Sequence, residues 1–410
     1  MVAERRVLLV LFEGLADTVV DSAVLDHTRQ AAERGVAFEI WAFCCTGESY
    51  RRSLAGLERA RRLAGWPIRV RRGVRPAVPF SVFLNRLLLG WTILRDKPGF
   101  DIVHARTDYS AVVAAAAKAM RKAVLVWDCR GDSAAEAVER LKQRRWLPGF
   151  VKHLKRRRAE RERALAARCC DRAMFVSEPL AQLCAPLLSG KPATVIPCAA
   201  SEDLFFYDPA LRARMRRELG YRDSDRVYVY SGSLVSYQCF DEMASLFQAW
   251  SAADPQARLL VLTPDADAAR QRLAHLDPDA VRVTSAQFDT VNDYLNAADA
   301  AFMLRRRSLV NRVASPTKFA EYCLTGLPVI MTDAVEEAWR TSGELGNRVR
   351  LEGGITEWPV AFDRAEVARR AQGLLGKRHL ASRYDQVYAL VEEHAGGRGA
   401  VRRRSALAKD

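Results

Sequence analysis

The sequence predicts an α/β protein with two doubly wound parallel sheets, each covered by helices on both faces. Three observations support this fold class. Short apolar runs alternate with helical stretches of ten or more residues, as in parallel sheets connected by helices. The alternation breaks near residue 205 and then restarts. The chain has 410 residues, of which 49% are hydrophobic, so each of two domains can form its own core.

The first half contains the first series of predicted elements. Buried strands are expected at residues 7–12, 38–43, 101–105 and 123–128, and the segments RAMFVS and ATVIP complete the series. A helix is expected over residues 21–34, and another in YSAVVAAAAKAMRK. Residues 1–205 should therefore form a first Rossmann-like domain.

The second half repeats the pattern after an irregular stretch and a basic helix that ends at Gly220. Strands are expected at residues 227–231, 258–263 and 281–284 and in DAAFML, with helices near 241–250 and in VNDYLNAA. Residues 206–375 should form a second Rossmann-like domain, and residues 376–410 a C-terminal helix and a basic, disordered tail. We expect the two domains to face a central cleft, with ligands beyond the C-terminal ends of the strands.

The charge balance indicates an anionic partner. Lys and Arg total 64 against 49 Asp and Glu, a net charge of +15. Nucleic acid, an anionic membrane or a phosphorylated ligand would each fit. No zinc finger, RNA-recognition motif or other nucleic-acid-binding module is recognisable, so we expect no nucleic-acid partner.

One segment could contact a membrane surface. KQRRWLPGFVKHLKRRRAERER, from Lys142 to Arg163, mixes basic residues with aromatic and aliphatic ones. The alternative is a solvated, arginine-rich helix. The chain has no 18-residue apolar run and no signal-peptide pattern, and its nine cysteines form neither a zinc motif nor a disulfide framework. We therefore expect a cytoplasmic protein with free thiols, peripheral on the inner face of the cell membrane if this segment binds lipid.

The segment NRVASPTKFAEYCLTGLPVI, residues 311–330, predicts a ligand site. Ser315 is a preferred N-cap and Pro316 a preferred first helical residue, which places Thr317 and Lys318 in the first turn. A lysine there opposes the helix dipole unless an anion is bound. Glu321, one turn further on, could accept hydrogen bonds from ribose hydroxyls. The alternative is a surface helix with ordinary charges.

These residues resemble a known family. SPTKFAEYCLTGLPVI is similar to the nucleotide-sugar site of retaining glycosyltransferases with the GT-B fold, family 4 in particular. VYVYSGSLVSYQCFDEM resembles the glycine loop of that fold, and FDIVHARTDYSA, VWDCRGD and FVSEPL resemble first-domain segments of a bacterial branch that assembles surface polysaccharide. The resemblance implies that Glu321 binds the ribose of a UDP- or GDP-linked donor. It also implies that the helix start holds the diphosphate near Gly232 and Ser233.

The sequence departs from the family pattern at two places. Many members have a second glutamate eight residues before the ribose-binding one, and that position is Val313 here. The cations common in the glycine loop are also missing. We expect Lys318 and one or more of Arg305, Arg306 and Arg307 to supply the positive charge, the alternative being that the arginines are ordinary surface residues.

The first domain should supply acceptor contacts and part of the catalytic geometry. Gly14, His104 and Arg106 follow or end predicted strands and are candidates for the acceptor side, although each could be structural. Asp128 and Arg130 follow a wholly apolar strand, and a charged pair there needs a partner. The resemblance places Asp128 near the position of a family histidine that approaches the transferred sugar.

The family mechanism requires positioning and electrostatic stabilisation more than acid–base chemistry. The leaving phosphate takes the proton of the acceptor hydroxyl, without a covalent enzyme intermediate, metal or cofactor. The resemblance thus implies a hexosyltransferase acting on a glycan, lipid-linked or small-molecule acceptor. Two alternatives remain: a non-catalytic binding or scaffold protein in glycan assembly, and a nucleotide-sugar epimerase.

Overall fold

Two compact units make up the chain. The computed structural model describes residues 5–15, 20, 24, 25, 28, 34–142, 149–352, 355–357 and 362–388. The first unit comprises Met1–Ile196 and Ala381–Asp410, and the second comprises Pro197–Leu380. The boundary between the two units therefore lies after Ile196, nine residues before the domain boundary predicted between residues 205 and 206. A second boundary lies within the C-terminal helix α18 (Lys377–Tyr388), whose last residues belong to the first unit.

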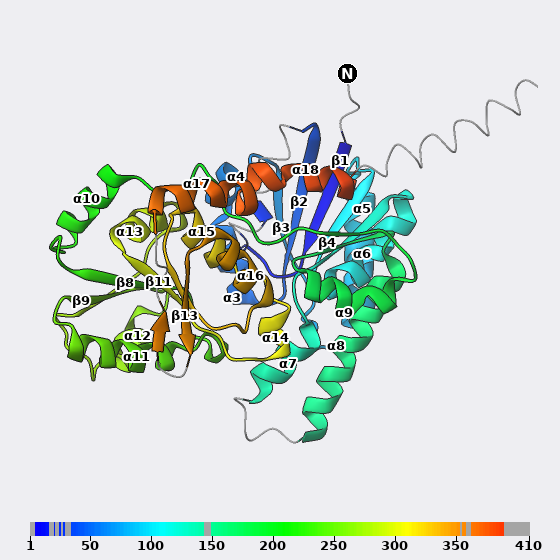
Figure 1. Ribbon diagram of the computed structural model, residues 1–410. Coiled ribbons are helices and arrows are strands. Elements are labelled where there is room, and N and C mark those ends of the chain that lie inside the picture. Colours follow the sequence, from blue (N-terminus) through cyan, green and yellow to red (C-terminus); the bar gives the residue numbers. More distant parts are fainter. Residues whose placement is uncertain are drawn as a thin grey trace, which may run out of the picture. The chain divides into compact units, whose positions relative to one another are not determined.

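A seven-stranded sheet in the order β3-β2-β1-β4-β5-β6-β7 forms the centre of the first unit (Figure 1). All neighbouring strands are parallel. The order reverses between β1 and β4, which makes this the point where a doubly wound sheet binds ligands. The strands are β1 (Arg5–Leu11), β2 (Val36–Cys44), β3 (Ile68–Arg72), β4 (Ile102–Arg106), β5 (Val124–Cys129), β6 (Arg172–Phe175) and β7 (Ala193–Val195).

The helices of the first unit connect these strands. They are α3 (Gly47–Ala55), α4 (Leu57–Ala64), α5 (Ser81–Asp96), α6 (Asp108–Arg121), α7 (Ser133–Lys142), α8 (Gly149–Cys169) and α9 (Glu178–Leu188). The sequence analysis predicted every strand of this sheet except β3. It predicted no helix or strand between residues 44 and 100. The helix predicted over residues 21–34 lies mostly outside the described residues.

The second unit has its own seven-stranded sheet, in the order β10-β9-β8-β11-β12-β13-β14. Only the edge strand β14 is antiparallel to its neighbour. The order again reverses beside the first strand, here between β8 and β11. The strands are β8 (Arg226–Ser231), β9 (Ala257–Leu262), β10 (Val281–Thr284), β11 (Ala300–Met303), β12 (Val329–Met331), β13 (Arg348–Glu352) and β14 (Ile355–Glu357).

The helices of the second unit confirm the predicted alternation. They are α10 (Pro209–Glu218), α11 (Phe240–Ala253), α12 (Ala266–Arg272), α13 (Val291–Ala297), α14 (Leu309–Arg312), α15 (Thr317–Leu324), α16 (Glu336–Leu345) and α17 (Arg364–Leu375). Within the described ranges, no helix has the length and apolar content needed to cross a membrane. All nine cysteines are free thiols, as expected.

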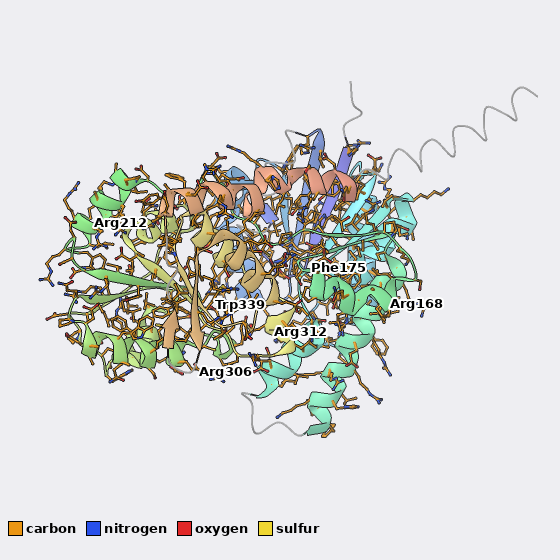
Figure 2. All side chains as sticks on the ribbon, in the orientation of Figure 1. Arg168, Phe175, Arg212, Arg306, Arg312 and Trp339 are labelled. Carbon is orange, nitrogen blue, oxygen red and sulfur yellow. The ribbon has the colours of Figure 1, made fainter. Side chains whose placement is uncertain are left out.

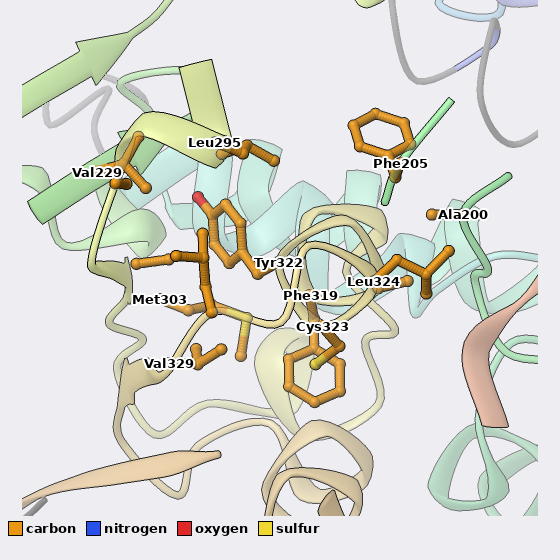
Figure 3. Close-up of a cluster of buried hydrophobic side chains, with 14 of the residues drawn as sticks. Ala200, Phe205, Val229, Leu295, Met303, Phe319, Tyr322, Cys323, Leu324 and Val329 are labelled. Atoms are coloured by element: carbon orange, nitrogen blue, oxygen red, sulfur yellow. The ribbon is translucent and has the colours of Figure 1, made fainter. Parts of the chain in front are cut away.

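Helix α15 is held in place by the core of the second unit (Figure 3). Its side chains Phe319, Tyr322 and Leu324 are buried in one cluster with residues of β8, β11 and β12. The Tyr322 hydroxyl accepts a hydrogen bond from the backbone N–H of Ser231, the last residue of β8, at 3.0 Å. Core packing therefore fixes the start of α15 beside the C-terminal end of β8.

Candidate functional site

The start of α15 differs from the prediction by one residue. Ser315 is not the N-cap, because its hydroxyl accepts a hydrogen bond from the backbone N–H of Cys198 at 2.9 Å. Pro316 occupies the cap position with extended backbone angles and no side-chain capping bond. The helix therefore begins at Thr317, and Lys318 is its second residue. The first backbone N–H groups of the helix still have no partner within it.

Lys318 points toward the glycine loop that follows β8. Its ammonium donates a hydrogen bond to Oε1 of Gln238 and lies 4.9 Å from the centre of the Tyr230 ring. Burial, reinforced by the nearby Arg305, holds the pKa of Lys318 well below its ordinary value, although Glu321 acts in the opposite direction. The partners in direct contact are neutral, so an anion brought close to this ammonium would favour its charged form.

Gly232 makes room for this ammonium. Its φ of +137° is unfavourable for other residues, and a Cβ atom there would lie 2.6 Å from Nζ of Lys318. The same Cβ would lie 3.1 Å from Oε1 of Gln238. Any side chain at this position would therefore displace the lysine. The sequence predicted a glycine that clears space for a phosphate, whereas the structure has the lysine ammonium in that space.

A second cation, Arg305, lies near Lys318. It follows β11, is 7% exposed, and its guanidinium lies 5.6 Å from the centre of the Tyr237 ring. Its Nη1 atom is buried and has no hydrogen-bond partner among the described residues. Burial lowers the pKa of Arg305. The site thus holds one buried and one partly buried cation, neither paired directly with an acid among the described residues, and such an arrangement favours an anionic ligand.

Glu321 lies one turn beyond Lys318 and is 9% exposed. Burial raises the pKa of Glu321 to about 7, despite the opposing effect of Lys318 and Lys377. None of the described residues donates a hydrogen bond to its carboxylate. Its acceptor oxygens are therefore available to a ligand hydroxyl, provided that the group is ionised.

The neighbouring arginines have other partners. Arg306 forms an ion pair with Glu242 and lies at the lower rim of the second unit in Figure 2. Arg307 pairs with Asp333, and its side chain is 82% exposed. Of the three candidate arginines, the structure thus brings only Arg305 to Lys318.

The glycine loop contributes residues that the sequence analysis did not assign to the site. Ser233, a predicted donor contact, has its hydroxyl hydrogen-bonded to the Gln238 amide at 3.0 Å. The Tyr230 hydroxyl donates to the backbone carbonyl of Ser233 at 2.7 Å. Gln238 and Tyr230 therefore hold both the loop and the lysine. The sequence contained one hint of this, because Gln238 lies within the segment that resembles the glycine loop.

The first unit gathers a separate group of charged side chains at the ends of β4 and β5. In the parallel register Arg106 lies opposite Asp128, and both side chains are buried. His104 approaches Asp128 with 3.4 Å between Nε2 and Oδ2, and Arg130 approaches it with 3.6 Å between Nη1 and Oδ1. The ends of β4 and β5 thus bring these four candidate residues together.

The charges of this group largely balance one another. Burial alone would raise the pKa of Asp128, but Arg130, His104 and Arg106 together hold it below its ordinary value. Nδ1 of His104 lies 2.9 Å from the hydroxyl of Tyr388, which comes from α18. No local signal in the sequence linked this tyrosine to His104. Arg106 lies near Glu13, with 3.4 Å between Nε and Oε2, but Nε and Nη1 of Arg106 have no hydrogen-bond partner among the described residues.

Gly14, a predicted acceptor contact, is required by packing. It has a φ of +77°, and a Cβ atom there would lie 2.8 Å from the hydroxyls of both Ser49 and Ser53. A side chain would therefore collide with α3. Packing against α3 is therefore sufficient reason for a glycine at position 14, and no ligand is needed to explain it.

The comparisons with known proteins agree with this architecture. The model of Glycosyltransferase Family 4 matches residues 20–204, which is less than half of the chain and lies mainly in the first unit. No curated protein sequence matches the chain.

Solved structures resemble the chain over nearly its whole length. A glycosyltransferase from Rickettsia africae is 12% identical with a TM-score of 0.66, covering 95% of this chain and 98% of its own. HepE from Anabaena, in complex with UDP, is 14% identical with a TM-score of 0.64, and the match covers 94% of this chain and 99% of HepE. A sucrose-phosphate synthase from Thermosynechococcus elongatus is 14% identical with a TM-score of 0.63, covering 95% and 100%. The chain therefore has the two-domain GT-B fold, which confirms the predicted fold class.

Proposed function

We propose that the protein is a retaining hexosyltransferase that takes its sugar from a UDP- or GDP-linked donor. The observation that carries this proposal is a pair of cations, the partly buried Lys318 at the start of α15 and the buried Arg305 after β11, with Glu321 one turn beyond Lys318. The match to Glycosyltransferase Family 4 and the UDP complex of HepE support the same conclusion.

The donor would bind in the second unit. Lys318, Arg305 and the first amides of α15 would meet the diphosphate, and Pro316 and Thr317 would set the position of those amides. Ribose hydroxyls would donate hydrogen bonds to Glu321. Gly232 would keep the lysine in place, and Ser233 would remain part of the loop that supports it.

The chemical step follows from this charge distribution. The bond between the anomeric carbon and the diphosphate oxygen breaks, and the acceptor oxygen forms a new bond to the same face of that carbon. The departing diphosphate takes the acceptor proton and accumulates negative charge, which Lys318 and Arg305 stabilise. The proposal includes no metal, cofactor or covalent enzyme intermediate.

The first unit would bind the acceptor. We assign Asp128 and Arg130 to contacts with the transferred sugar or the attacking hydroxyl, and His104 and Arg106 to their positioning. The acceptor class is a glycan, a lipid-linked sugar or a small molecule of bacterial surface-polysaccharide assembly. The place of action is the cytoplasm, with residues 142–163 touching the anionic inner face of the membrane. If neutralising Arg156, Arg157 and Arg158 leaves vesicle binding unchanged, that contact is excluded.

Thermal unfolding in the presence of UDP, GDP, ADP, CMP and their sugars tests the donor site. A nucleotide at a hundred times its dissociation constant should stabilise the protein by about 2.7 kcal/mol. Glu321→Gln should lose most of this effect, and Glu344→Gln, an exposed glutamate on α16 of the same unit, should keep it. No stabilisation by any nucleotide would overturn the proposal.

Turnover assays then separate the alternatives. Release or transfer of the sugar with its anomeric configuration retained supports the transferase. Nucleotide binding without turnover of any donor identifies a scaffold protein. Isomerisation of the donor sugar without an acceptor identifies an epimerase, a class represented among the similar structures by a putative UDP-N-acetylglucosamine 2-epimerase from Listeria monocytogenes.

A further inference from the structure

Helix α5 of the first unit has an outer face unlike that of an ordinary surface helix. Phe83, Leu87, Trp91 and Leu94 are 59%, 56%, 56% and 65% exposed, and Phe80, just before the helix, is 82% exposed. Surface helices normally place polar residues on their outer side. From Ser81 to Leu94 the helix has a single charged residue, Arg86, whose guanidinium donates to the carbonyl of Val112.

The exposed side chains form a continuous stripe. With Leu84, which is 41% exposed, they follow spacings of three and four residues along the helix. The opposite face, including Leu89 and Ile93, is fully buried. The opposite face already attaches the helix to the domain, so the exposed stripe is not needed for that packing. Contiguous exposed apolar surface of this kind marks an interaction site.

Helix α8 also exposes apolar side chains. Phe150 and Leu154, near the start of α8, are 67% and 59% exposed. Arg158 of α8 donates a hydrogen bond to the hydroxyl of Ser81 at 3.3 Å, which links this helix to the start of α5. We call the outer residues of α5 together with Phe150 and Leu154 the apolar ridge.

The segments that carry the apolar ridge are rich in basic residues. Residues 69–97 contain seven basic side chains and one acid, Asp96, which is paired with Arg69, Arg71 and Arg95 and is only 8% exposed. Helix α8 contains eight basic side chains against two acids. Arg95 also lies 4.6 Å from the centre of the Trp91 ring, so its charge sits at the edge of the apolar surface.

We propose that the apolar ridge of α5 and α8 inserts into the interface of an anionic lipid bilayer, with α5 lying parallel to the membrane plane. The sixteen residues of α5 extend about 24 Å, which suits a helix lying in the headgroup region. Aromatic rings beside arginines favour that region, and the basic residues of these segments attract anionic headgroups. A second copy of the chain fits less well, because two such ridges would bring like charges together.

This inference shares the membrane partner proposed above for residues 142–163 but assigns the apolar contact mainly to α5. It does not depend on the glycosyltransferase activity. Nucleotide-induced stabilisation tests that activity, and vesicle binding tests the ridge, so the failure of either is separable from the other.

Co-sedimentation of the full chain with vesicles tests the proposal. We expect binding to vesicles of phosphatidylglycerol and phosphatidylcholine in equal parts, and much weaker binding to phosphatidylcholine alone. Leu87→Glu and, separately, Leu94→Glu should each reduce partitioning at least about tenfold, because both place a charge in the apolar layer. Leu54→Glu, at a 44% exposed position on α3 of the same unit, should leave it unchanged. Thermal unfolding of each variant checks the fold.

Trp91 provides a direct readout. Its fluorescence should shift to shorter wavelength on anionic vesicles, and the difference between wild type and Trp91→Phe isolates its signal from the other tryptophans. If Leu87→Glu and Leu94→Glu bind anionic vesicles as tightly as the wild type does, the proposal is overturned. So would sedimentation equilibrium that shows a dimer lost in Leu87→Glu, since the partner would then be a second copy. Absence of vesicle binding by the wild type would also exclude it.

Discussion

Each unit gathers charged side chains near the C-terminal ends of its parallel strands, close to the reversal of strand order, but the two units balance those charges differently. In the first unit the carboxylate of Asp128 lies among His104, Arg130 and Arg106. In the second unit aromatic rings and an amide lie around Lys318 and Arg305, and no acid in the described part of the chain contacts either cation directly. Similar topology thus produces one group that is already neutralised and one that attracts an anion.

The difference has a physical consequence for each site. Buried cations without a paired acid carry a desolvation cost that an anionic ligand can offset. A carboxylate already surrounded by cations gains less from a ligand, but it holds its neighbours in a fixed geometry. We therefore expect substitutions in the second unit to change nucleotide binding most, and substitutions in the first unit to change stability and positioning.

Lys318→Met should have the largest effect. It removes a charge that no other described side chain can replace at the same place, and we expect the affinity for the stabilising nucleotide to fall about 100-fold. Titration calorimetry with that nucleotide would measure the change. Lys318→Arg keeps the charge in a larger group and should bind more tightly than the methionine variant. Equal affinity of the methionine variant and the wild type would show that the cation does not meet the ligand.

Glu321 should make the stability of the second unit depend on pH. The pKa of its carboxyl is about 7 when folded, above its ordinary value in an unfolded chain, so the folded state binds the proton more tightly. The wild type should therefore lose stability as pH rises from about 4.5 to 7, by about 3 kcal/mol at most, relative to Glu321→Gln. Chemical unfolding of both proteins at pH 5 and pH 8 would show this difference. If the difference in free energy of unfolding between the two proteins is the same at pH 5 and pH 8, the raised pKa of Glu321 is contradicted.

Ionisation of Glu321 should also change nucleotide affinity. As pH rises, this affinity should increase while the stability of the second unit decreases. Ribose hydroxyls need the charged carboxylate as acceptor, so the nucleotide affinity of the wild type should rise as pH increases through about 7. Glu321→Gln should lack this rise. If the affinities of the wild type and Glu321→Gln change with pH in the same way, the ribose contact is contradicted, because Lys318, whose own pKa is lowered, is present in both proteins.

Local patterns predicted the parts of the molecule that depend on local chemistry. The alternation of apolar and amphipathic runs predicted both sheets, whereas the anion site at the lysine of the helix start stays a prediction. The pattern could not show that Ser315 bonds to Cys198 rather than capping its helix, since both roles use the same hydroxyl. The contact between His104 and Tyr388 spans 284 residues and depends on where α18 packs. The sequence analysis predicted no element between residues 44 and 100, so it missed both α5 and its exposed apolar side chains.

Tyr388→Phe should have a moderate effect confined to the first unit. It removes the hydroxyl that lies 2.9 Å from Nδ1 of His104, and both groups are buried. The loss should reduce stability by about 1 kcal/mol, with nucleotide affinity unchanged. Denaturant unfolding and calorimetry would measure the two quantities. Tyr384→Phe, on the same helix but only partly buried, serves as the control. A change in nucleotide affinity would mean that this hydrogen bond affects the second unit as well.

The smallest effect should come from Arg306→Met, which forms a sharp contrast with Arg305→Met. Arg306 is paired with Glu242 at the surface, and such pairs contribute between 0 and about 1 kcal/mol. Arg305 is buried with an unpartnered nitrogen, so its replacement by methionine removes a desolvated charge and should preserve or increase stability while weakening nucleotide binding. Of these two adjacent residues, we thus expect Arg305 to contribute to nucleotide binding and Arg306 only to a surface ion pair. Unfolding and nucleotide titration of both variants would decide the point, and equal losses of affinity would contradict the assignment of Arg305 alone to the site.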